Sequence, residues 1–372
     1  MKIFYLVTKS EIGGVQVHIC QLADYLLSQG DKVAVMSFPG GWLQDRIERI
    51  GAKFYPNKFL KHTPNPIGIL KAMGEIKRAV SDFKPDLVSC HSTMAGALGR
   101  LVIKNKIPTL FTAHGWGFTK GTPIWQRILV FFLEKIAALW SEKIICVSEC
   151  DRKLALKYGI ASKNKIITIH NGVEIVPEQR KEKDYQREKV RIVFVGRLSK
   201  QKDPLLLLRA FSELPPELKN KAKIVIIGDG PKREKLENFI KQSKLEEKIK
   251  LRGALPREKV FEMLRESDIF VLTSNWEGFP RTILEAMSFG LAIVASDVGG
   301  VREAINEDCG ILVKRGDKEG LKRALEKLLK NPEIVQKMGE KSRERVEREF
   351  SLEKMLRATE QVYQEILFAL KK

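Results

Sequence analysis

Along the first half of the chain, short apolar runs rich in β-branched residues alternate with longer amphipathic stretches. The apolar runs predict strands at 2–8, 32–37, 86–90, 108–112, 143–147 and 165–169. The amphipathic stretches predict helices at 15–29, 66–83, 93–104, 124–140 and 149–158. Nearly continuous apolar strands that are separated by helices are typical of a parallel sheet with both faces covered.

This pattern pauses once and then restarts. The pause at 174–190, EIVPEQRKEKDYQREKV, is polar and charged and has no apolar face, so we interpret it as a linker. Beyond it, strands are predicted at 190–196, 223–227, 248–252, 268–272, 291–295 and 310–313. Three helices near 317–329, 332–347 and 352–370 close the chain.

Two successive doubly wound units are the simplest architecture for this order of elements. We expect an α/β fold with an N-terminal Rossmann-like domain at 1–174, a linker at 175–190 and a second Rossmann-like domain at 191–350. A C-terminal helix at 351–372 would cross back to the first domain. Sites in such sheets form at the carboxyl ends of strands, so two sheets face to face would enclose a cleft.

Composition agrees with a soluble protein of two domains. The chain has 372 residues, of which 44% are hydrophobic. The opening MKIFYLVT reads as a strand rather than a signal peptide, and no apolar run is long enough to span a bilayer as a helix. The five cysteines lie in or beside apolar runs, and we interpret them as reduced core thiols of a cytoplasmic protein.

The net charge of +20 favours anionic partners, which include nucleic acid, acidic lipid headgroups and phosphorylated small molecules. None of the common nucleic-acid reading modules is present, so we expect no nucleic-acid partner.

Glycines and cations follow several predicted strands. Gly13 and Gly14 precede a helix whose N-terminus can bind phosphate, although a tight structural turn is an equal alternative. Their spacing is not G-x-G-x-x-G, which argues against a dehydrogenase. Arg197 and Lys202 lie at a strand–helix junction suited to a diphosphate, with solvated surface charge as the alternative.

The most informative segment is 275–286, which follows the strand DIFVL. Pro280 is a natural first-turn residue, so a helix should run from there to about Phe289. Glu277 would lie in the loop above this helix and Glu285 inside it. One carboxylate would accept hydrogen bonds from sugar hydroxyls and the other from a ribose, unless both are surface residues.

The segment EGFPRTILE resembles the E-x7-E signature of the family 4 retaining glycosyltransferases of the GT-B fold. Further motifs of that family agree in order: GGVQVH, TAHGWGF, HNGVE, GRLSKQK, GDGP and GGVREAI. The resemblance covers nearly the whole chain and points to enzymes that build bacterial surface polysaccharides and lipid-linked oligosaccharides. It implies transfer of a sugar from a nucleotide sugar, UDP-linked by default, with retention of configuration.

The resemblance also assigns roles to individual residues. Gly13 and Gly14 would contact the donor phosphate or sugar through backbone, and His114 would contact the donor sugar near the reacting centre. Arg197 and Lys202 would neutralise the diphosphate as the leaving group develops charge.

In the second domain, by the same resemblance, Glu277 would bind donor hydroxyls and Glu285 the ribose. Further residues would line the sugar and phosphate pocket or border the base: Gly278, Phe279 and Pro280 for the pocket, and Gly228, Pro231 and Arg252 for the base. No D-x-D sequence occurs, so the resemblance implies a reaction without a metal or other cofactor.

Two stretches of the first domain suggest a membrane. Residues 53–62 and 116–120, the latter continuing to Trp125 and Arg127, mix aromatic residues with basic ones as membrane–water interfaces do. We expect peripheral docking on the anionic inner leaflet and a lipid-linked saccharide acceptor, with core packing plus solvated lysines as the alternative. The segment 128–140 is interrupted by charges, so we predict a core helix rather than an anchor.

Two other functions remain open at this stage. One is a nucleotide-sugar epimerase or a glycosyl synthase with a soluble acceptor, both of which share the fold. The other is a basic nucleic-acid-binding protein, which the absence of a reading module disfavours.

Overall fold

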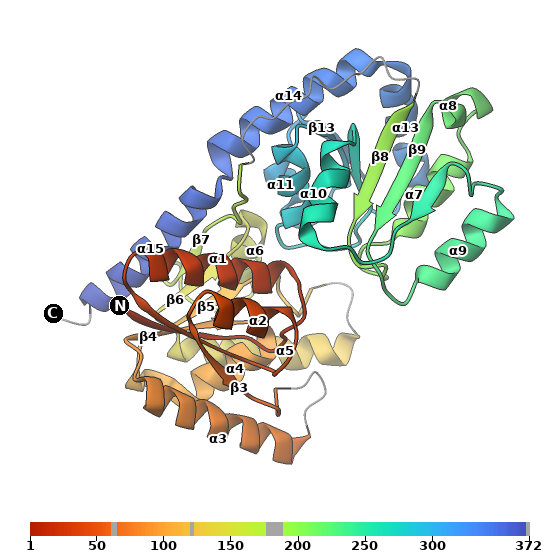
Figure 1. The fold of residues 1–372 in the computed structure, drawn as a ribbon. Helices are drawn as coiled ribbons and strands as arrows, with labels where there is room; N and C mark the ends of the chain where they lie inside the picture. The colour runs from red at the N-terminus through yellow and green to blue at the C-terminus, as the bar shows by residue number, and fades with distance from the viewer. Residues whose placement is uncertain (61–64, 120–122, 176–188, 370–372) are drawn as a thin grey trace. The chain divides into compact units, whose positions relative to one another are not determined.

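The computed structural model describes residues 1–60, 65–119, 123–175 and 189–369 (Figure 1). These residues divide into two compact units. The first unit is Met1–Asn171 with Glu353–Lys372, and the second is Gly172–Leu352. Most of the linker predicted at 175–190 lies outside the described residues.

The first unit is built on a parallel sheet of seven strands in the order β3-β2-β1-β4-β5-β6-β7. The strands are β1 (Lys2–Leu6), β2 (Lys32–Ser37), β3 (Lys53–Pro56), β4 (Leu87–His91), β5 (Thr109–Ala113), β6 (Lys143–Cys146) and β7 (Ile166–Thr168). Its helices are α1 (Gly14–Ser28), α2 (Trp42–Arg49), α3 (Pro66–Phe83), α4 (Thr93–Ile103), α5 (Ile124–Ala137), α6 (Glu149–Lys157) and α15 (Leu352–Ala369), with short 3₁₀ turns at Lys104–Lys106 and Ala138–Trp140.

The second unit is built on a parallel sheet of six strands in the order β10-β9-β8-β11-β12-β13. The strands are β8 (Val190–Val195), β9 (Ala222–Ile227), β10 (Ile249–Leu251), β11 (Ile269–Leu272), β12 (Ala292–Ser296) and β13 (Gly310–Val313). Its helices are α7 (Pro204–Ser212), α8 (Pro216–Asn220), α9 (Arg233–Gln242), α10 (Arg257–Arg265), α11 (Arg281–Ser288), α12 (Val301–Ala304), α13 (Lys318–Lys330) and α14 (Pro332–Glu349).

Each sheet reverses its winding direction once, and this reversal positions the candidate site. In the first sheet the reversal lies between β1 and β4, and in the second it lies between β8 and β11. Loops that leave two such neighbouring strands diverge and leave room for a ligand at the carboxyl edge of the sheet. The predicted fold class of two doubly wound parallel sheets is therefore confirmed.

The C-terminal helix α15 packs in the first unit. The Tyr363 hydroxyl is buried and lies within hydrogen-bonding distance, 3.2 Å, of both the Tyr5 hydroxyl and Ser89 Oγ. Tyr25 of α1 donates to Glu360 of α15 at 2.6 Å. These bonds join the end of the chain to β1, β4 and α1 of the first sheet.

The edge strand β3 was not predicted as a strand. Its residues 53–56 were interpreted as part of a membrane-facing stretch, yet they pair in parallel with β2. Tyr55 packs beside Phe4, with ring centroids 5.6 Å apart. In the described part of 53–62, Tyr55 and Phe59 pack partly buried against the core, which favours the alternative of core packing, while contact with a membrane stays a prediction. Residues 61–62 lie outside the described residues.

The prediction of a core helix at 128–140 is wrong. On α5 the charged Glu134 is buried, and its carboxylate forms an ion pair of 2.6 Å with the buried Arg100 of α4. Most of the large apolar side chains of the helix are exposed instead, although Val130 and Phe131 pack partly buried against the core. Those more than half exposed from α5 to the following 3₁₀ turn are Ile124, Trp125, Ile128, Leu129, Phe132, Ile136 and Leu139.

Two smaller expectations about the first unit also change. Trp116 and Phe118 belong to the core rather than to an interface, since both are buried and their rings stack 5.2 Å apart. Lys120 lies outside the described residues. Four of the cysteines are buried as expected, but Cys150 is exposed. Among the described residues, no helix combines the length and apolar character that a membrane span requires.

Candidate functional site

Two loops of the second unit are joined into one platform. The loop at 196–203 follows β8, and the loop at 273–280 follows the neighbouring strand β11. The backbone N–H of Asn275 donates to the Gln201 carbonyl at 2.7 Å, and Gln201 Nε2 donates to the Trp276 carbonyl at 3.1 Å. Because the bonds run in both directions, each loop fixes the position of the other.

This platform brings together the cation and the carboxylate that the sequence singled out. Lys202 Nζ lies 2.6 Å from Glu277 Oε1, and the side chains are 17% and 7% exposed. Ser274 Oγ donates to the same carboxylate oxygen at 2.6 Å. The pair is therefore largely desolvated and held in one geometry, where charges interact more strongly than at an open surface.

The turn at Gly299 supports the loop that carries Glu277. Gly299 has φ +54°, and a Cβ there would lie 1.9 Å from the Glu277 carbonyl oxygen. Gly300 N–H donates to the Gly278 carbonyl at 2.8 Å. These glycines belong to the motif GGVREAI, which by itself indicates no role for them. The structure shows that the loop requires a residue without a side chain at Gly299.

Other predicted residues of the platform take different positions. Arg197 is exposed on the loop after β8. The Phe279 side chain is buried against Phe350, with ring centroids 5.3 Å apart, so it offers a ligand its backbone rather than its ring. Pro280 caps α11, and the helix begins at Arg281 rather than at the proline itself.

Glu285 lies on α11 beside two arginines that the sequence analysis missed. Its Oε1 is 3.6 Å from Arg257 Nη2, and Arg281 is buried one helical turn before it. Burial raises the pKa of Glu285, and the charges of Arg281 and Arg257 oppose this. Burial lowers the pKa of Arg281 to about 10. Arg281 and Glu285 are four positions apart on a predicted helix, and this spacing was the sequence feature that could have indicated their contact.

The residues predicted to border a base lie at the carboxyl ends of β9 and β10. Gly228 has φ +134°, and a Cβ there would lie 2.0 Å from the Gly196 carbonyl oxygen. Its close backbone approach is thus to the loop after β8. Pro231 and Arg252 are both exposed. The structure places Gly228 against the loop after β8 and leaves Pro231 and Arg252 exposed.

In the first unit, Gly13 and Gly14 lie at the N-terminus of α1, whereas the sequence predicted that both precede a helix from Val15. Gly13 is the N-cap residue in extended conformation, and the helix begins at Gly14. This helix, which is described throughout, has no side-chain cap at its N-terminus and no acidic residue in its first turn. Its first N–H groups are therefore suited to an anion such as a phosphate.

His114 follows β5 and lies close to two further histidines, His91 and His18. Its Nε2 is 3.0 Å from Nδ1 of His91, which ends β4, and its ring centroid is 5.0 Å from that of His18 on α1. His91 Nε2 lies 3.1 Å from Ser89 Oγ. Burial, and then the charge of His114, lowers the pKa of His91 well below its ordinary value. A bond from Tyr363 to Ser89 extends this chain to α15.

Of these three histidines, only His114 was predicted from the sequence. A lone histidine at the end of an apolar strand, as His91 is, reads as an ordinary core residue. His18 follows Gly14 by about one helical turn, which was the available signal. Only the order of the strands, with β4 beside β5, brings the three together.

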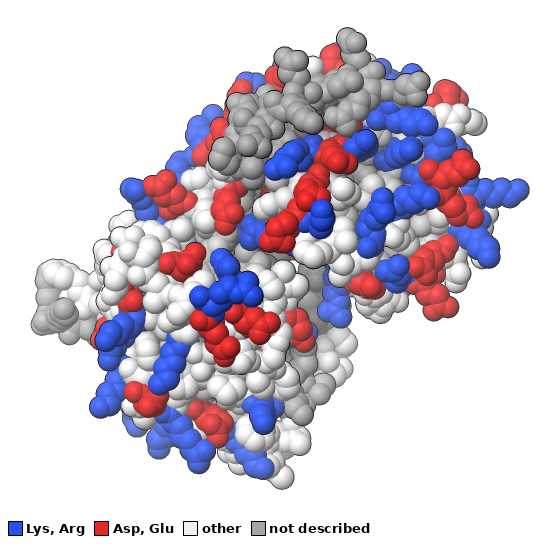
Figure 2. All heavy atoms as spheres, viewed as in Figure 1, with Lys and Arg blue, Asp and Glu red and all other residues white. Residues whose placement is uncertain are grey.

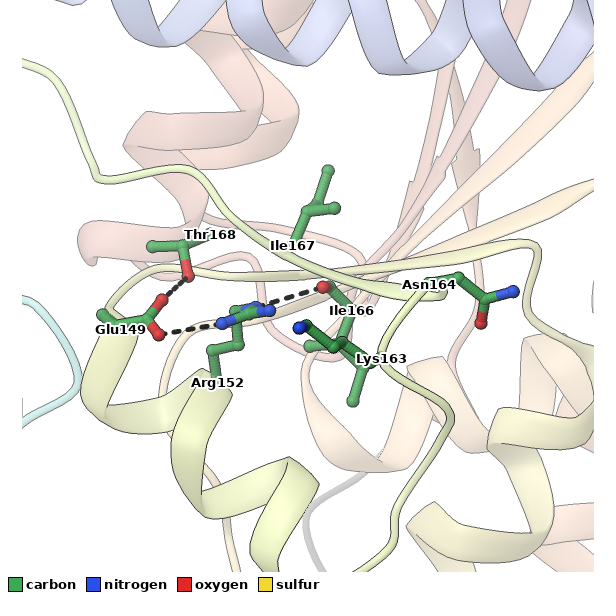
Figure 3. A pocket seen from close by; sticks show the side chains of 7 residues that line it. All are labelled: Glu149, Arg152, Lys163, Asn164, Ile166, Ile167 and Thr168. Atoms are coloured by element: carbon green, nitrogen blue, oxygen red, sulfur yellow. Dashed lines mark hydrogen bonds and ion pairs between the residues drawn. The ribbon is translucent and has the colours of Figure 1, made fainter.

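A separate shallow depression of the first unit lies beside β7 (Figure 3). Glu149 there accepts from Arg152 at 2.8 Å and from Thr168 at 2.8 Å, so its carboxylate is already satisfied. None of the predicted site residues lines this depression. It is therefore not part of the candidate site.

Lys and Arg side chains are spread over the visible face of each unit, with Asp and Glu among them (Figure 2). On that face the positive charge does not form a continuous stripe like those that follow a nucleic-acid backbone. Single cations on the loop after β8, such as Arg197 and Lys202, are a more specific feature than this spread of charge.

Comparison with protein families matches two consecutive parts of the chain. The model described as Glycosyltransferase Family 4 matches residues 12–176, and the model described as Glycosyl transferases group 1 matches residues 176–345. Together they extend over both units and all the predicted site residues.

Two relatives from Escherichia coli are similar over most of the chain. One is a UDP-Gal:alpha-D-GlcNAc-diphosphoundecaprenol alpha-1,3-galactosyltransferase, 27% identical over 378 residues, covering 98% of this chain and 96% of that protein. The other is the O-antigen biosynthesis glycosyltransferase WbnH, 29% identical over 312 residues, covering 83% of this chain and 85% of that protein.

Solved structures show the same fold. The sucrose-phosphate synthase of Thermosynechococcus elongatus superimposes with a TM-score of 0.84 at 19% identity, covering 99% of this chain and 100% of that chain. The Anabaena protein HepE in complex with UDP gives a TM-score of 0.82 at 18% identity, covering 98% of this chain and 100% of that chain.

Proposed function

This chain belongs to the family 4 glycosyltransferases of the GT-B fold, and from that premise we propose that it is a retaining, metal-independent enzyme. It transfers a sugar from a UDP-sugar to a lipid-linked saccharide during the synthesis of a bacterial surface polysaccharide. The galactosyltransferase to which it is similar acts, by its name, on a sugar carried by diphosphoundecaprenol.

The observation that carries the proposal is the desolvated pair of Lys202 and Glu277 at the carboxyl edge of the second sheet. When a sugar diphosphate binds, its negative charge attracts Lys202. Glu277 then accepts hydrogen bonds from donor hydroxyls in place of the ammonium group. Arg197, exposed on the same loop, adds a second cation for the diphosphate.

The reaction follows from this placement of charge. The bond between the anomeric carbon and the diphosphate oxygen breaks, and the diphosphate keeps the electron pair. The acceptor oxygen bonds to the anomeric carbon from the same face, and its proton passes to a diphosphate oxygen. Lys202 and Arg197 stabilise the diphosphate as it becomes more negative, which is the role a metal ion has in other transferases.

The remaining site residues have supporting roles in this proposal. The start of α1 at Gly13 and Gly14 binds phosphate or sugar through backbone N–H groups. His114 contacts the donor sugar near the anomeric carbon. In the second unit, Glu285 binds the ribose while Gly228, Pro231 and Arg252 border the base, and the backbone of 278–280 lines the sugar pocket.

The experiment that tests this function is a transfer assay with a panel of UDP-, GDP- and ADP-sugars and a short-chain polyprenyl-diphosphate sugar as acceptor. We expect thermal stabilisation by one class of donor, a new glycoside with the donor's anomeric configuration, and full activity in the presence of EDTA. Inversion at the anomeric carbon, or strict dependence on Mn²⁺, would contradict the proposed mechanism. Release of epimerised nucleotide sugar without any glycoside would identify an epimerase.

The exposed face of α5 supports docking on the cytoplasmic face of the membrane, where such an acceptor is embedded. Trp125, Leu129 and Phe132 are each more than half exposed, and Arg127 and Lys135 lie on the same helix. Aromatic and aliphatic side chains mixed with cations suit the boundary between anionic headgroups and acyl chains. The net charge of +20 adds attraction to an anionic surface.

Vesicle binding tests this partner. We expect binding to vesicles containing anionic lipid at low salt and weaker binding to neutral ones. Changing Leu129→Glu and Phe132→Glu together should reduce partitioning by more than about tenfold, because each apolar side chain contributes ~1.5–3 kcal/mol when buried. Phe368→Glu on α15, where Phe368 is 62% exposed, is the matched control and should bind like the unaltered protein.

A further inference from the structure

Three imidazoles converge in the first unit from three separate elements. His18 lies on α1, His91 ends β4 and His114 follows β5. One ring nitrogen of each lies within 4.8 Å of the others, and among the described residues this is the one such group of ligand side chains. Imidazole nitrogens suit Zn²⁺, Co²⁺, Ni²⁺ and Cu²⁺, and three of them leave a coordination position open.

The distances are close to those that a metal ion requires. His91 Nδ1 and His114 Nε2 are 3.0 Å apart and share one proton. Two nitrogens bound to a tetrahedral zinc ion at ~2.0–2.1 Å lie about 3.3 Å from each other. These two rings therefore need to separate by only a few tenths of an ångström to admit an ion, and the His18 nitrogen, which lies within 4.8 Å of the other two, moves toward it to complete the site.

One of the three ligands is already oriented by its neighbours. Ser89 Oγ lies 3.1 Å from His91 Nε2 and accepts from Tyr363 at 3.2 Å. When His91 carries its proton on Nε2 and donates it to Ser89, the lone pair of Nδ1 points to His114. A hydrogen bond on the far nitrogen that fixes the tautomer and the ring is typical of metal-binding histidines. His114 is partly exposed, which gives an ion a path to the group.

We propose that His18, His91 and His114 bind a divalent transition-metal ion, Zn²⁺ fitting best, and that the ion inhibits sugar transfer. Binding replaces the proton between His91 and His114. That proton moves from Nε2 to Nδ1 of the His114 ring, so none needs to leave the protein. The inhibition rests on the proposed function, because it follows from removing His114 from the donor sugar. The binding of the metal ion does not depend on the proposed function.

The binding is tested on the full chain freed of metal with a chelator. Co²⁺ is the probe, because its complexes with three imidazoles absorb visible light, and Zn²⁺ is then added as competitor. We expect one ion per chain, and His18→Gln or His91→Gln should weaken binding by at least about 100-fold. Ser89→Ala should weaken it by ~10–100-fold through loss of orientation. Far-ultraviolet circular dichroism verifies that each variant is folded.

Matched controls separate this site from the other possible ligands of the chain. His170→Gln changes a histidine outside the group, and Cys150→Ser removes the exposed thiol. Both variants should bind Co²⁺ like the unaltered protein. Unchanged binding in His18→Gln and His91→Gln, or loss of binding in Cys150→Ser, would overturn the proposal.

The inhibition is tested by adding Zn²⁺ to the transfer assay. Activity should fall in step with the occupancy measured by Co²⁺ competition, and His18→Gln should lose this sensitivity. Inhibition that persists in His18→Gln would refute the inhibitory role. If no donor supports transfer, the proposed function fails while the binding result stands by itself.

Discussion

Lys202 Nζ lies 2.6 Å from Glu277 Oε1, although the two residues belong to loops that follow different strands of the second sheet. Both side chains are mostly buried, and Ser274 holds the same carboxylate oxygen. A pair this desolvated is stabilised by its own attraction and costly to break from one side. In the proposed function this pair exchanges partners when a diphosphate binds, and Arg197, exposed on the same loop as Lys202, adds a second cation.

The first prediction concerns the cation of this pair. Lys202→Met removes the charge that we propose stabilises the leaving diphosphate, so kcat/KM should fall by about 10²–10³-fold, as for the loss of one oxyanion-stabilising donor. Lys200→Met, at an exposed position on the same loop, is the control and should stay within about threefold of the original rate. Steady-state kinetics at saturating acceptor measures both. Equal rates in the two variants would remove Lys202 from the mechanism.

The fold was predictable because doubly wound sheets have a clear sequence pattern. Buried parallel strands such as β12, whose five residues are all buried, are continuous apolar runs. The edge strand β3 is different, since Lys53 and Pro56 at its ends are exposed. Short edge strands are only partly covered, so the apolar signal is weak and the strand was missed.

The candidate site was predictable as single residues but not as interactions. The resemblance selected Lys202 and Glu277 separately, and nothing in the sequence indicates that residues 75 positions apart form an ion pair. That contact depends on β8 lying beside β11, which is a property of strand order. His91 was missed for the same reason, because its contact with His114 depends on the pairing of β4 with β5.

The second prediction concerns the turn behind Glu277. Gly299→Ala places a Cβ 1.9 Å from the Glu277 carbonyl oxygen, so the loop must move and kcat/KM should fall by at least about tenfold. Gly51→Ala is the control, since its φ is +82° but nothing lies within 4 Å of the added Cβ. Both variants carry the left-handed strain of about 1 kcal/mol. Thermal melting measures the strain that the two variants share, and steady-state kinetics measures the effect of moving the loop. Similar activity in the two variants would contradict the role proposed for Gly299.

The third prediction concerns the buried ion pair that attaches α5. Arg100→Met or Glu134→Met alone leaves one buried charge without its partner and should lower the free energy of unfolding by about 3–5 kcal/mol. The double variant should regain most of this loss, because it removes both desolvation costs. Urea unfolding of the two single variants and the double variant gives the double-mutant cycle. If the two losses of unfolding free energy add in the double variant, packing rather than charge dominates. Arg78→Met, in the exposed pair with Glu75, is the control and should change stability little.

The fourth prediction concerns the pH dependence of stability. Burial, followed by the charge of His114, holds the pKa of His91 well below 6.5 in the folded state. Above about pH 6.5 the side chain is neutral in both states and contributes no slope. As the pH falls below that value, the unfolded chain binds a proton that the folded chain does not, so the free energy of unfolding decreases. One such group contributes up to about 1.4 kcal/mol per pH unit until the folded pKa is reached.

His91→Gln should remove this contribution, and that difference isolates His91 from the other groups that titrate in the same range. Urea unfolding in the presence of a chelator, at intervals between about pH 7.5 and 5.5, gives the slope for each protein. The unaltered chain should lose stability more steeply than His91→Gln below pH 6.5, even where the variant is less stable at neutral pH. Parallel curves for the original chain and His91→Gln would mean that His91 accepts a proton in the folded state as readily as in the unfolded one.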